Sequence, residues 1–231
     1  MSVVDELVGV QEAARRLGVS TWQVQHLGRT GDLTFVGRGL VDRTSLERLT
    51  AARRGSHSRG WAEHTAWGAI SLLAGQDAEW LGAVQRSRLR SILRASDVSG
   101  VIVRARHRAV ARVYGGHSSV ATRLRAALIV PDRQGLGLVR IGVQDQIDGY
   151  LSAGDEEVQL IRRYALREDQ RGQYTLRATT FDLDVVRALA ESSDGGRVLA
   201  AFDAAGSFDP RERGAAETLI ALALDDLKAA R

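Results

Sequence analysis

The sequence predicts an α+β protein with two main parts, a small N-terminal unit of short helices and a hairpin, and a mixed α/β body. Three observations predict this class. Apolar residues recur at helical spacing between residues 10 and 27, short apolar runs flank a glycine-rich turn at 37–39, and helix-like and strand-like patterns alternate after residue 98. A polar stretch at 53–60 (RRGSHSRG) separates the parts. We therefore expect domains at 1–54 and 98–231, joined by a helical, tryptophan- and arginine-rich segment at 55–97.

The first unit begins with two short helices. Apolar side chains at i, i+3, i+4 and i+7 predict the first of them. These side chains are Val10, Ala13, Ala14 and Leu17. Gly18 ends this helix, Ser20 is placed as an N-cap, and Val24 and Leu27 form the apolar stripe of the second helix. Two short helices joined by a tight turn make a helix-turn-helix.

A hairpin and a third helix complete the unit. Residues 33–36 and 40–41 flank Gly37-Arg38-Gly39, and this glycine-rich turn can supply positive φ between two short strands. Residues 44–53 then predict a helix with Leu46 and Leu49 facing inward. The hairpin is placed as the wing of a winged helix-turn-helix.

The pattern VxEAAxxLGVS, followed by VxxL, GxL and a Val-Gly turn, resembles the winged helix-turn-helix of the excisionase and MerR-type DNA-binding families. The resemblance covers about the first 50 residues. It implies that the second helix enters the major groove and that the wing lies along the backbone or minor groove. The implied base-facing residues are Thr21, Trp22, Gln23, Gln25 and His26, with Arg29 nearer phosphate, Arg38 at the wing tip and Arg43 behind it. A protein-docking module is the alternative for this unit.

Charge is distributed unevenly along the chain. The first 130 residues carry 19 basic against 10 acidic residues, and the last 101 carry 13 against 18. A basic front half on an acidic back half suits a protein that holds a polyanion at one end and a different partner at the other.

Arginines are concentrated between residues 86 and 112. A helix at 80–96 is expected to place Val84, Leu89, Ile92 and Leu93 on its apolar side. Arg86, Arg90 and Arg94 then lie together on the opposite side, as a solvated face or as a surface for phosphate or a partner. Arg88 projects onto the apolar side, where it snorkels, pairs with a buried acid or reaches a partner.

Further along, a strand is predicted at 101–105, and RARHRAVARV at 104–113 alternates basic and apolar residues as a half-exposed strand does. The even-numbered arginines would share one face of the sheet. They are Arg104, Arg106, Arg108 and Arg112. A row of like charges repels itself unless it faces an anion, so we weigh a nucleic acid or acidic protein partner against a loosely solvated strand.

The rest of the body alternates between helical and strand patterns. Helices are expected at 118–127, 145–151, 156–165, 182–189 and 209–229, and strands at 128–130, 138–143, 174–180 and 198–202. Asp182 is placed as the cap of one helix, and Asp209-Pro210 opens the last.

Catalytic, metal and cofactor patterns are weak. The chain has no cysteine and no Gly-x-Ser-x-Gly motif, and His57 and His64 lack further ligands. Gly135-Leu136-Gly137 lacks the third glycine of a dinucleotide loop. Asp182 and Asp184 are explained by helix capping better than by magnesium binding. We therefore expect no catalytic residues, no metal and no cofactor. Without an apolar run of 18 residues or a leader, we expect a cytoplasmic protein with no membrane contact.

These features predict a sequence-specific repressor that binds double-stranded DNA at its own promoter. The overall layout resembles abortive-infection E type antitoxins, and this resemblance implies autoregulation and a C-terminal body that neutralises a nucleotidyltransferase-type toxin. A stand-alone regulator, whose body dimerises or binds an effector, is the alternative, and a homodimer is possible in either case. An enzyme of nucleic acid modification is the alternative from another class.

Overall fold

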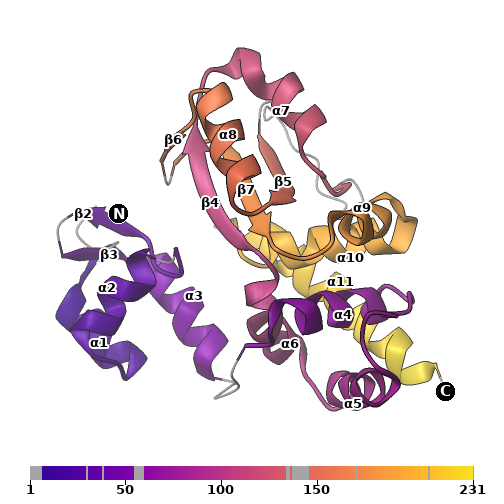
Figure 1. Cartoon of the computed structure of the whole chain (residues 1–231). Coiled ribbons are helices and arrows are strands. Elements are labelled where there is room, and N and C mark those ends of the chain that lie inside the picture. The colour runs from indigo at the N-terminus through magenta and orange to yellow at the C-terminus, as the bar shows by residue number, and fades with distance from the viewer. Residues whose placement is uncertain are drawn as a thin grey trace. The chain divides into compact units, whose positions relative to one another are not determined.

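The computed structural model describes residues 7–29, 31–37, 39–54, 60–133, 136, 146–169, 171–207 and 209–230. The chain divides into two compact units, Met1–Ser58 and Arg59–Arg231. Each unit contains helices and its own sheet (Figure 1). The protein is therefore a mixed α and β structure, as the sequence predicts, and the division falls within the polar stretch at 53–60.

The described part of the smaller unit contains three helices and three short strands. In chain order these are β1 (Leu7–Gly9), α1 (Val10–Leu17), α2 (Thr21–Arg29), β2 (Phe35–Gly37), β3 (Leu40–Asp42) and α3 (Arg43–Arg54). The strands pair antiparallel in the order β1-β3-β2. Two helices and a hairpin thus lie where the sequence predicts them, and β1 adds a third strand to the hairpin.

Local chemistry explains the turn between α1 and α2. Gly18 has φ +65°, which a glycine adopts without strain, and its N–H closes the last turn of α1 on the carbonyl oxygen of Arg15 (3.3 Å). Behind the turn, Val24, Leu33 and Leu46 are fully buried. These side chains belong to a core shared by all three helices.

The larger unit contains the remaining elements. Its helices are α4 (Glu63–Leu73), α5 (Ala83–Arg94), α6 (Val98–Ala105), α7 (Ala121–Ala127), α8 (Asp155–Arg163), α9 (Leu183–Glu191), α10 (Ser193–Ala204) and α11 (Pro210–Ala229). Its strands are β4 (Val110–Gly115), β5 (Ile147–Ser152), β6 (Arg167–Glu168) and β7 (Tyr174–Thr179). Short 3-10 turns occupy Arg106–Arg108 and Ser118–Val120. None of the helices in the described ranges has the length and apolar character needed to cross a membrane.

The sheet of this unit has the strand order β5-β7-β4-β6. β5 and β7 are parallel, with Ile147 opposite Tyr174, whereas β4 runs antiparallel to β7 and β6. One face carries buried Leu151, Leu176 and Ala178 and packs against α7 and α8 (Figure 1). The crossover through α8 joins the two parallel strands, as parallel pairing requires.

A second core lies among the helices. Trp67 and Ile70 of α4, Leu93 of α5, Leu199 of α10 and Ile220 of α11 are all buried in it. The segment 60–97 therefore belongs to the same compact unit as the body, since its helices share a core with α10 and α11.

Three predicted elements are of the wrong type. Residues 101–105 belong to α6 and residues 198–202 to α10, although both were expected to be strands, and residues 147–151 lie in β5 although a helix was expected. Helix caps explain the first two. Asp97 accepts a hydrogen bond from the N–H of Gly100 (2.8 Å), and Ser192 accepts one from the N–H of Gly195 (3.1 Å). Each cap starts a helix and overrides the strand preference of the β-branched residues that follow.

The Gly195-Gly196 pair has a packing role inside α10. A Cβ on Gly195 would overlap the carbonyl oxygen of Leu189, and one on Gly196 would overlap that of Ala190. The glycines let the start of α10 approach the end of α9 closely. The predicted strand at 138–143, together with Gly135 and Gly137, lies outside the described residues.

Candidate nucleic-acid interface

Helix α2 presents its polar side chains to solvent. Val24 is buried in the core of the smaller unit. The predicted DNA-facing residues of this helix are all exposed: Thr21, Trp22, Gln23, Gln25, His26 and Arg29. Because successive helical residues are 100° apart, all of these except Gln23 fall on one side of α2. The helix has no acidic residue. This side, which we call the α2 face, can therefore approach a polyanion without repulsion from its own carboxylates.

Two aromatic rings are ordered on the α2 face. The Trp22 and His26 rings are stacked, with centroids 5.6 Å apart and planes at 1°. Trp22 nevertheless remains 63% exposed. The two rings can stack because Trp22 and His26 are four residues apart on one helix. They form an aromatic surface that faces solvent without a bound ligand.

Gln23 has a capping role. Its side-chain Oε1 accepts from the N–H of Ser20 (3.0 Å), and its own N–H donates to Ser20 Oγ (3.2 Å). This reciprocal pair is a capping box, which satisfies two backbone donors at the start of α2. The Ser-x-x-Gln spacing in the sequence is typical of such a capping box. Gln23 therefore does not belong to the α2 face.

The hairpin is described on both sides of its tip. Arg38 lies outside the described residues, and Gly39 has φ +77°. Arg43 is the first residue of α3 and is half-buried, directly after Asp42, whose carboxylate caps α3 by accepting from the N–H of Ser45 (2.7 Å). Arg43 thus follows the hairpin directly in the chain.

Gly28 allows the hairpin to pack on α2. A Cβ at this position would overlap the ring of Phe35 in β2. The glycine lowers the intrinsic stability of the helix, but it lets an aromatic side chain cross the helix at close range. The hairpin and α2 are thereby held in one arrangement.

Helix α5 is rotated about its axis relative to the prediction. Leu89 and Leu93 are buried as expected, but Val84 and Ile92 are 64% and 39% exposed. Arg88 lies on this exposed side, since it is one turn from each of them. Within the described residues, Arg88 makes no hydrogen bond or ion pair, so it neither snorkels nor pairs with a buried acid.

The other arginines of α5 face the protein. Arg86 Nε and Arg90 Nη2 lie 3.3 and 3.4 Å from Asp77 Oδ1. Arg94 donates to two carbonyl oxygens at the C-terminal end of α11, at 3.3 and 2.6 Å. Those carbonyls lack partners within their own helix and lie at the negative end of its dipole. The three guanidinium groups therefore have structural partners on the side predicted to be solvated, and this explains the rotation of the helix.

The predicted row of arginines on one sheet face does not exist. Arg104 lies in α6, Arg106 and Arg108 lie in the following 3-10 turn, and Arg112 lies in β4. The prediction is wrong because the Asp97 cap turns the first part of this stretch into a helix, where residues two apart no longer share a face.

Each of these arginines has its own contact. Arg104 lies over the Trp61 ring, 5.9 Å from its centroid. Arg106 Nε is 2.9 Å from the Nε2 atom of the adjacent histidine, and Arg112 pairs with Glu157 Oε1 at 2.7 Å. Arg106 and Arg112 remain exposed, so only these two could also meet a partner.

Arg108 is instead part of a buried polar network. It is 5% exposed and donates to the Tyr150 hydroxyl (3.0 Å) and to Asp203 Oδ1 (2.5 Å). The Tyr150 hydroxyl donates to the same carboxylate oxygen at 2.5 Å. Burial alone would lower the pKa of Arg108, yet Tyr150 and Asp203 beside it raise that pKa above its ordinary value. Arg108 therefore stays charged and is unavailable to phosphate.

The network continues along the sheet. Arg177 holds Asp148 with two hydrogen bonds (2.6 and 2.9 Å), its Nε lies 3.2 Å from Asp203 Oδ1, and Arg133 Nη2 lies 2.7 Å from Asp148 Oδ2. Burial opposes ionisation of Asp148, but Arg177 and then Arg133 outweigh it and hold the pKa of this carboxyl below its ordinary value. Sequence reasoning missed these residues. A strand at 147–152 would have placed Asp148 and Tyr150 on one face, and the predicted helix concealed that signal.

Acid should weaken the larger unit through Asp148. Because its pKa is lower in the folded chain than in the unfolded chain, its contribution is complete above the unfolded value of about 3.9 and is lost as pH falls through the folded value. We expect the free energy of unfolding, from urea titrations at pH 7 and pH 3, to fall less between these pH values in Asp148→Asn than in the original chain. Equal losses in the two proteins would contradict this role.

The residues that the sequence analysis weighed as metal ligands are Asp182, Asp184, His57 and His64. Asp182 accepts from the N–H of Asp184 (2.9 Å) and caps α9. In the ranges that the structure describes, no three His, Asp or Glu side chains are grouped to hold a metal ion. His57 lies outside those ranges.

Comparisons of the chain with protein-family models, with curated proteins and with solved structures found no match.

Proposed function

We propose that the smaller unit is a winged helix-turn-helix and that the protein is a sequence-specific DNA-binding repressor of its own promoter. The observation that carries the proposal is the α2 face. It combines an exposed aromatic stack, the exposed amide of Gln25 and the charge of Arg29 on the second of two short helices that a tight turn joins. A glutamine amide can make a paired hydrogen bond to adenine in the major groove, and an arginine at the helix end reaches phosphate.

The direct test is fluorescence anisotropy of the full-length chain with a labelled duplex from its own upstream region and with a scrambled duplex. The expected result is tighter binding to the upstream duplex and affinity that falls steeply between two salt concentrations, because each neutralised phosphate releases counterions. Equal or absent binding to the two duplexes would overturn the proposal and favour a protein-docking module.

Base recognition should depend on Gln25 and His26. Replacing either with alanine is expected to cost about 1–3 kcal/mol of discrimination between the two duplexes, because in the proposed complex each side chain contacts a base edge. The same anisotropy titrations measure this ratio. Gln11→Ala is the matched control, since Gln11 is an exposed glutamine on α1. An unchanged ratio in both test variants would show that the α2 face does not read sequence.

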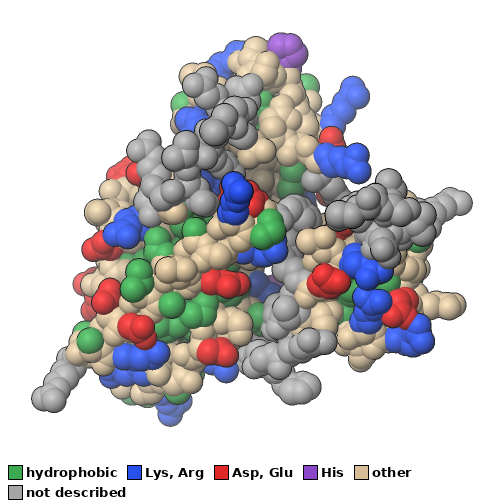
Figure 2. All heavy atoms as spheres, turned by 180° about the vertical axis from the view of Figure 1, so that it is seen from behind, with side chains coloured by type: hydrophobic (Ala, Val, Ile, Leu, Met, Phe, Trp, Pro, Cys, Tyr) green, Lys and Arg blue, Asp and Glu red, His purple; other side chains and the backbone are tan. Residues whose placement is uncertain are grey.

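We further propose that the larger unit neutralises a nucleotidyltransferase-type toxin, which would make the protein an autoregulating antitoxin. Support comes from the exposed side of α11, where Leu222 is 57% exposed and Asp226, one turn from it, and Asp225, which pairs with Lys228 (3.2 Å), are also exposed. Figure 2 shows acidic and hydrophobic side chains interspersed over the helices of this unit. An apolar side chain within an acidic surface suits a basic protein partner.

Co-expression with the product of an adjacent gene tests this second step. If that product halts growth, the full-length chain should restore growth, and Leu222→Glu should restore it less well while leaving DNA binding intact. An adjacent product without toxicity, or a toxicity that the chain does not relieve, would favour the alternative of a stand-alone regulator.

A further inference from the structure

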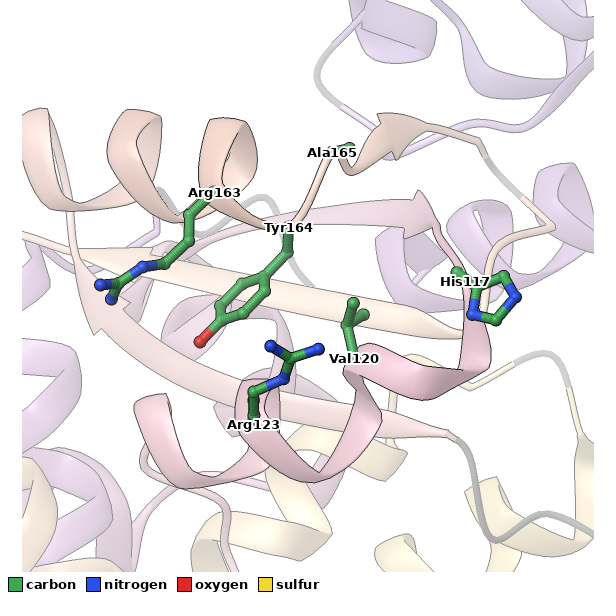
Figure 3. A pocket seen from close by; sticks show the side chains of 6 residues that line it. All are labelled: His117, Val120, Arg123, Arg163, Tyr164 and Ala165. Atoms are coloured by element: carbon green, nitrogen blue, oxygen red, sulfur yellow. The ribbon is translucent and has the colours of Figure 1, made fainter.

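A pocket of about 500 Å³ opens on the outer side of the sheet layer, where the start of α7 lies near the end of α8. Its lining residues are His117, Val120, Arg123, Arg163, Tyr164 and Ala165 (Figure 3). Arg123 comes from the first turns of α7, and Arg163 is the last residue of α8. The pocket is thus built from two segments about 40 residues apart in sequence, which only the fold brings together.

The two arginines of the pocket are not neutralised. Within the described residues, neither Arg123 nor Arg163 makes a hydrogen bond or ion pair, and no acidic side chain lines the pocket. Other arginines of this unit are engaged. Arg112 pairs with Glu157 (2.7 Å), and Arg125, two residues after Arg123, donates to a backbone carbonyl (3.4 Å). Two positive charges that line one pocket without an acidic side chain beside them favour the binding of an anion there.

The remaining walls add a hydroxyl and apolar surface. Figure 3 shows the Tyr164 ring between the side chains of Arg123 and Arg163, whose guanidinium groups point in different directions, and Val120 and then His117 lying further along the pocket. Tyr164 is half-buried and packs against the core under α7 and α8. Ala165 follows with φ +49°, a left-handed conformation that is uncommon for alanine. The turn at Ala165 places Tyr164 and Ala165 in one wall.

We propose that this pocket binds the phosphate group of a small phosphorylated molecule. A guanidinium fork matches two oxygens of a phosphate, so each of the two arginines that line the pocket can bind such an anion. The Tyr164 hydroxyl can donate a further hydrogen bond, and Val120 and Ala165 supply apolar surface for the rest of the ligand. A volume of about 500 Å³ lies in the range of small-molecule sites. The proposal is independent of DNA binding by the smaller unit.

Isothermal titration calorimetry of the full-length chain tests the proposal with inorganic phosphate, pyrophosphate and adenosine 5′-monophosphate, each at constant ionic strength set with chloride. Saturable binding of at least one of these probes is expected. Arg123→Gln and Arg163→Gln should each weaken it at least tenfold, and Tyr164→Phe should weaken it less. Arg162→Gln is the matched control, because Arg162 is an exposed arginine at the same helix end that does not line the pocket.

Three outcomes would overturn the proposal. The first is that no probe binds, and the second is that Arg123→Gln and Arg163→Gln bind as the original chain does. The third is that these variants lose affinity for a DNA duplex while phosphate probes fail to bind, which would assign the arginines to the nucleic acid backbone. Circular dichroism of each variant confirms that an altered affinity does not reflect unfolding.

Discussion

Replacing Asp203 with alanine is expected to destabilise the larger unit by about 3–5 kcal/mol, the cost of removing one partner from a buried ion pair. The Asp203 side chain is 1% exposed and accepts from Arg108 and Tyr150 through a single oxygen, with Arg177 3.2 Å from the same atom. Without the carboxylate, Arg108 remains buried with no counter-charge. Asp203→Asn should cost less, because it retains a side-chain oxygen that can accept hydrogen bonds.

Urea unfolding followed by circular dichroism measures this effect. The matched control is Asp226→Ala, which removes an exposed carboxylate from α11 and should change the free energy of unfolding by less than about 0.5 kcal/mol. A loss for Asp203→Ala no greater than that of the control would show that the network contributes little.

Replacing Trp67 with alanine is expected to cost a similar amount, about 3–5 kcal/mol. Trp67 is 1% exposed and its indole N–H donates to Thr179 Oγ1 (3.2 Å). Its ring is stacked with Phe181 and meets Tyr150 edge to face, with centroids 5.8 and 5.3 Å away. One side chain thus connects α4 to two strands of the sheet and to Phe181, two residues before α9.

This substitution also tests whether the segment at 60–97 folds with the body. If they share one core, Trp67→Ala should shift the whole unfolding transition of the larger unit to lower urea, with one slope. Trp22→Ala is the control, since Trp22 is an exposed tryptophan of the other unit and should leave that transition unchanged. A separate, earlier transition confined to the helices would indicate that the segment is independent.

The two variants should not be additive. Tyr150 contacts the Trp67 ring and bonds to Asp203, so both substitutions act on the same side chain. Residues that share a partner show interaction energies of about 0.5–3 kcal/mol in double-mutant cycles. The polar network and the aromatic cluster are therefore expected to behave as one unit.

Local signals in the sequence determined many of the element boundaries. Gly18 ends α1, Ser20 and Gln23 cap α2, Asp182 caps α9, and Asp209 with Pro210 opens α11. These features depend on hydrogen bonds and backbone angles within a few residues, so they can be predicted without knowing the fold. The exposed α2 face follows from the same local helical spacing.

The tertiary structure decided the contacts between residues that are far apart in the sequence. The close approach of α10 to α9 depended on Gly195 and Gly196, and the rotation of α5 depended on Asp77 and on carbonyls at the end of α11. The pairing of Arg108 with Asp203, and the presence of Arg123 and Arg163 in the lining of one pocket, bring together residues 95 and 40 positions apart in the chain. Neither pairing leaves a periodic pattern in the sequence, because the partners meet only when separate elements pack. The sequence alone therefore determined the caps, the two short helices at the N-terminus and the charge distribution, whereas packing decided which arginines have structural partners among the described residues.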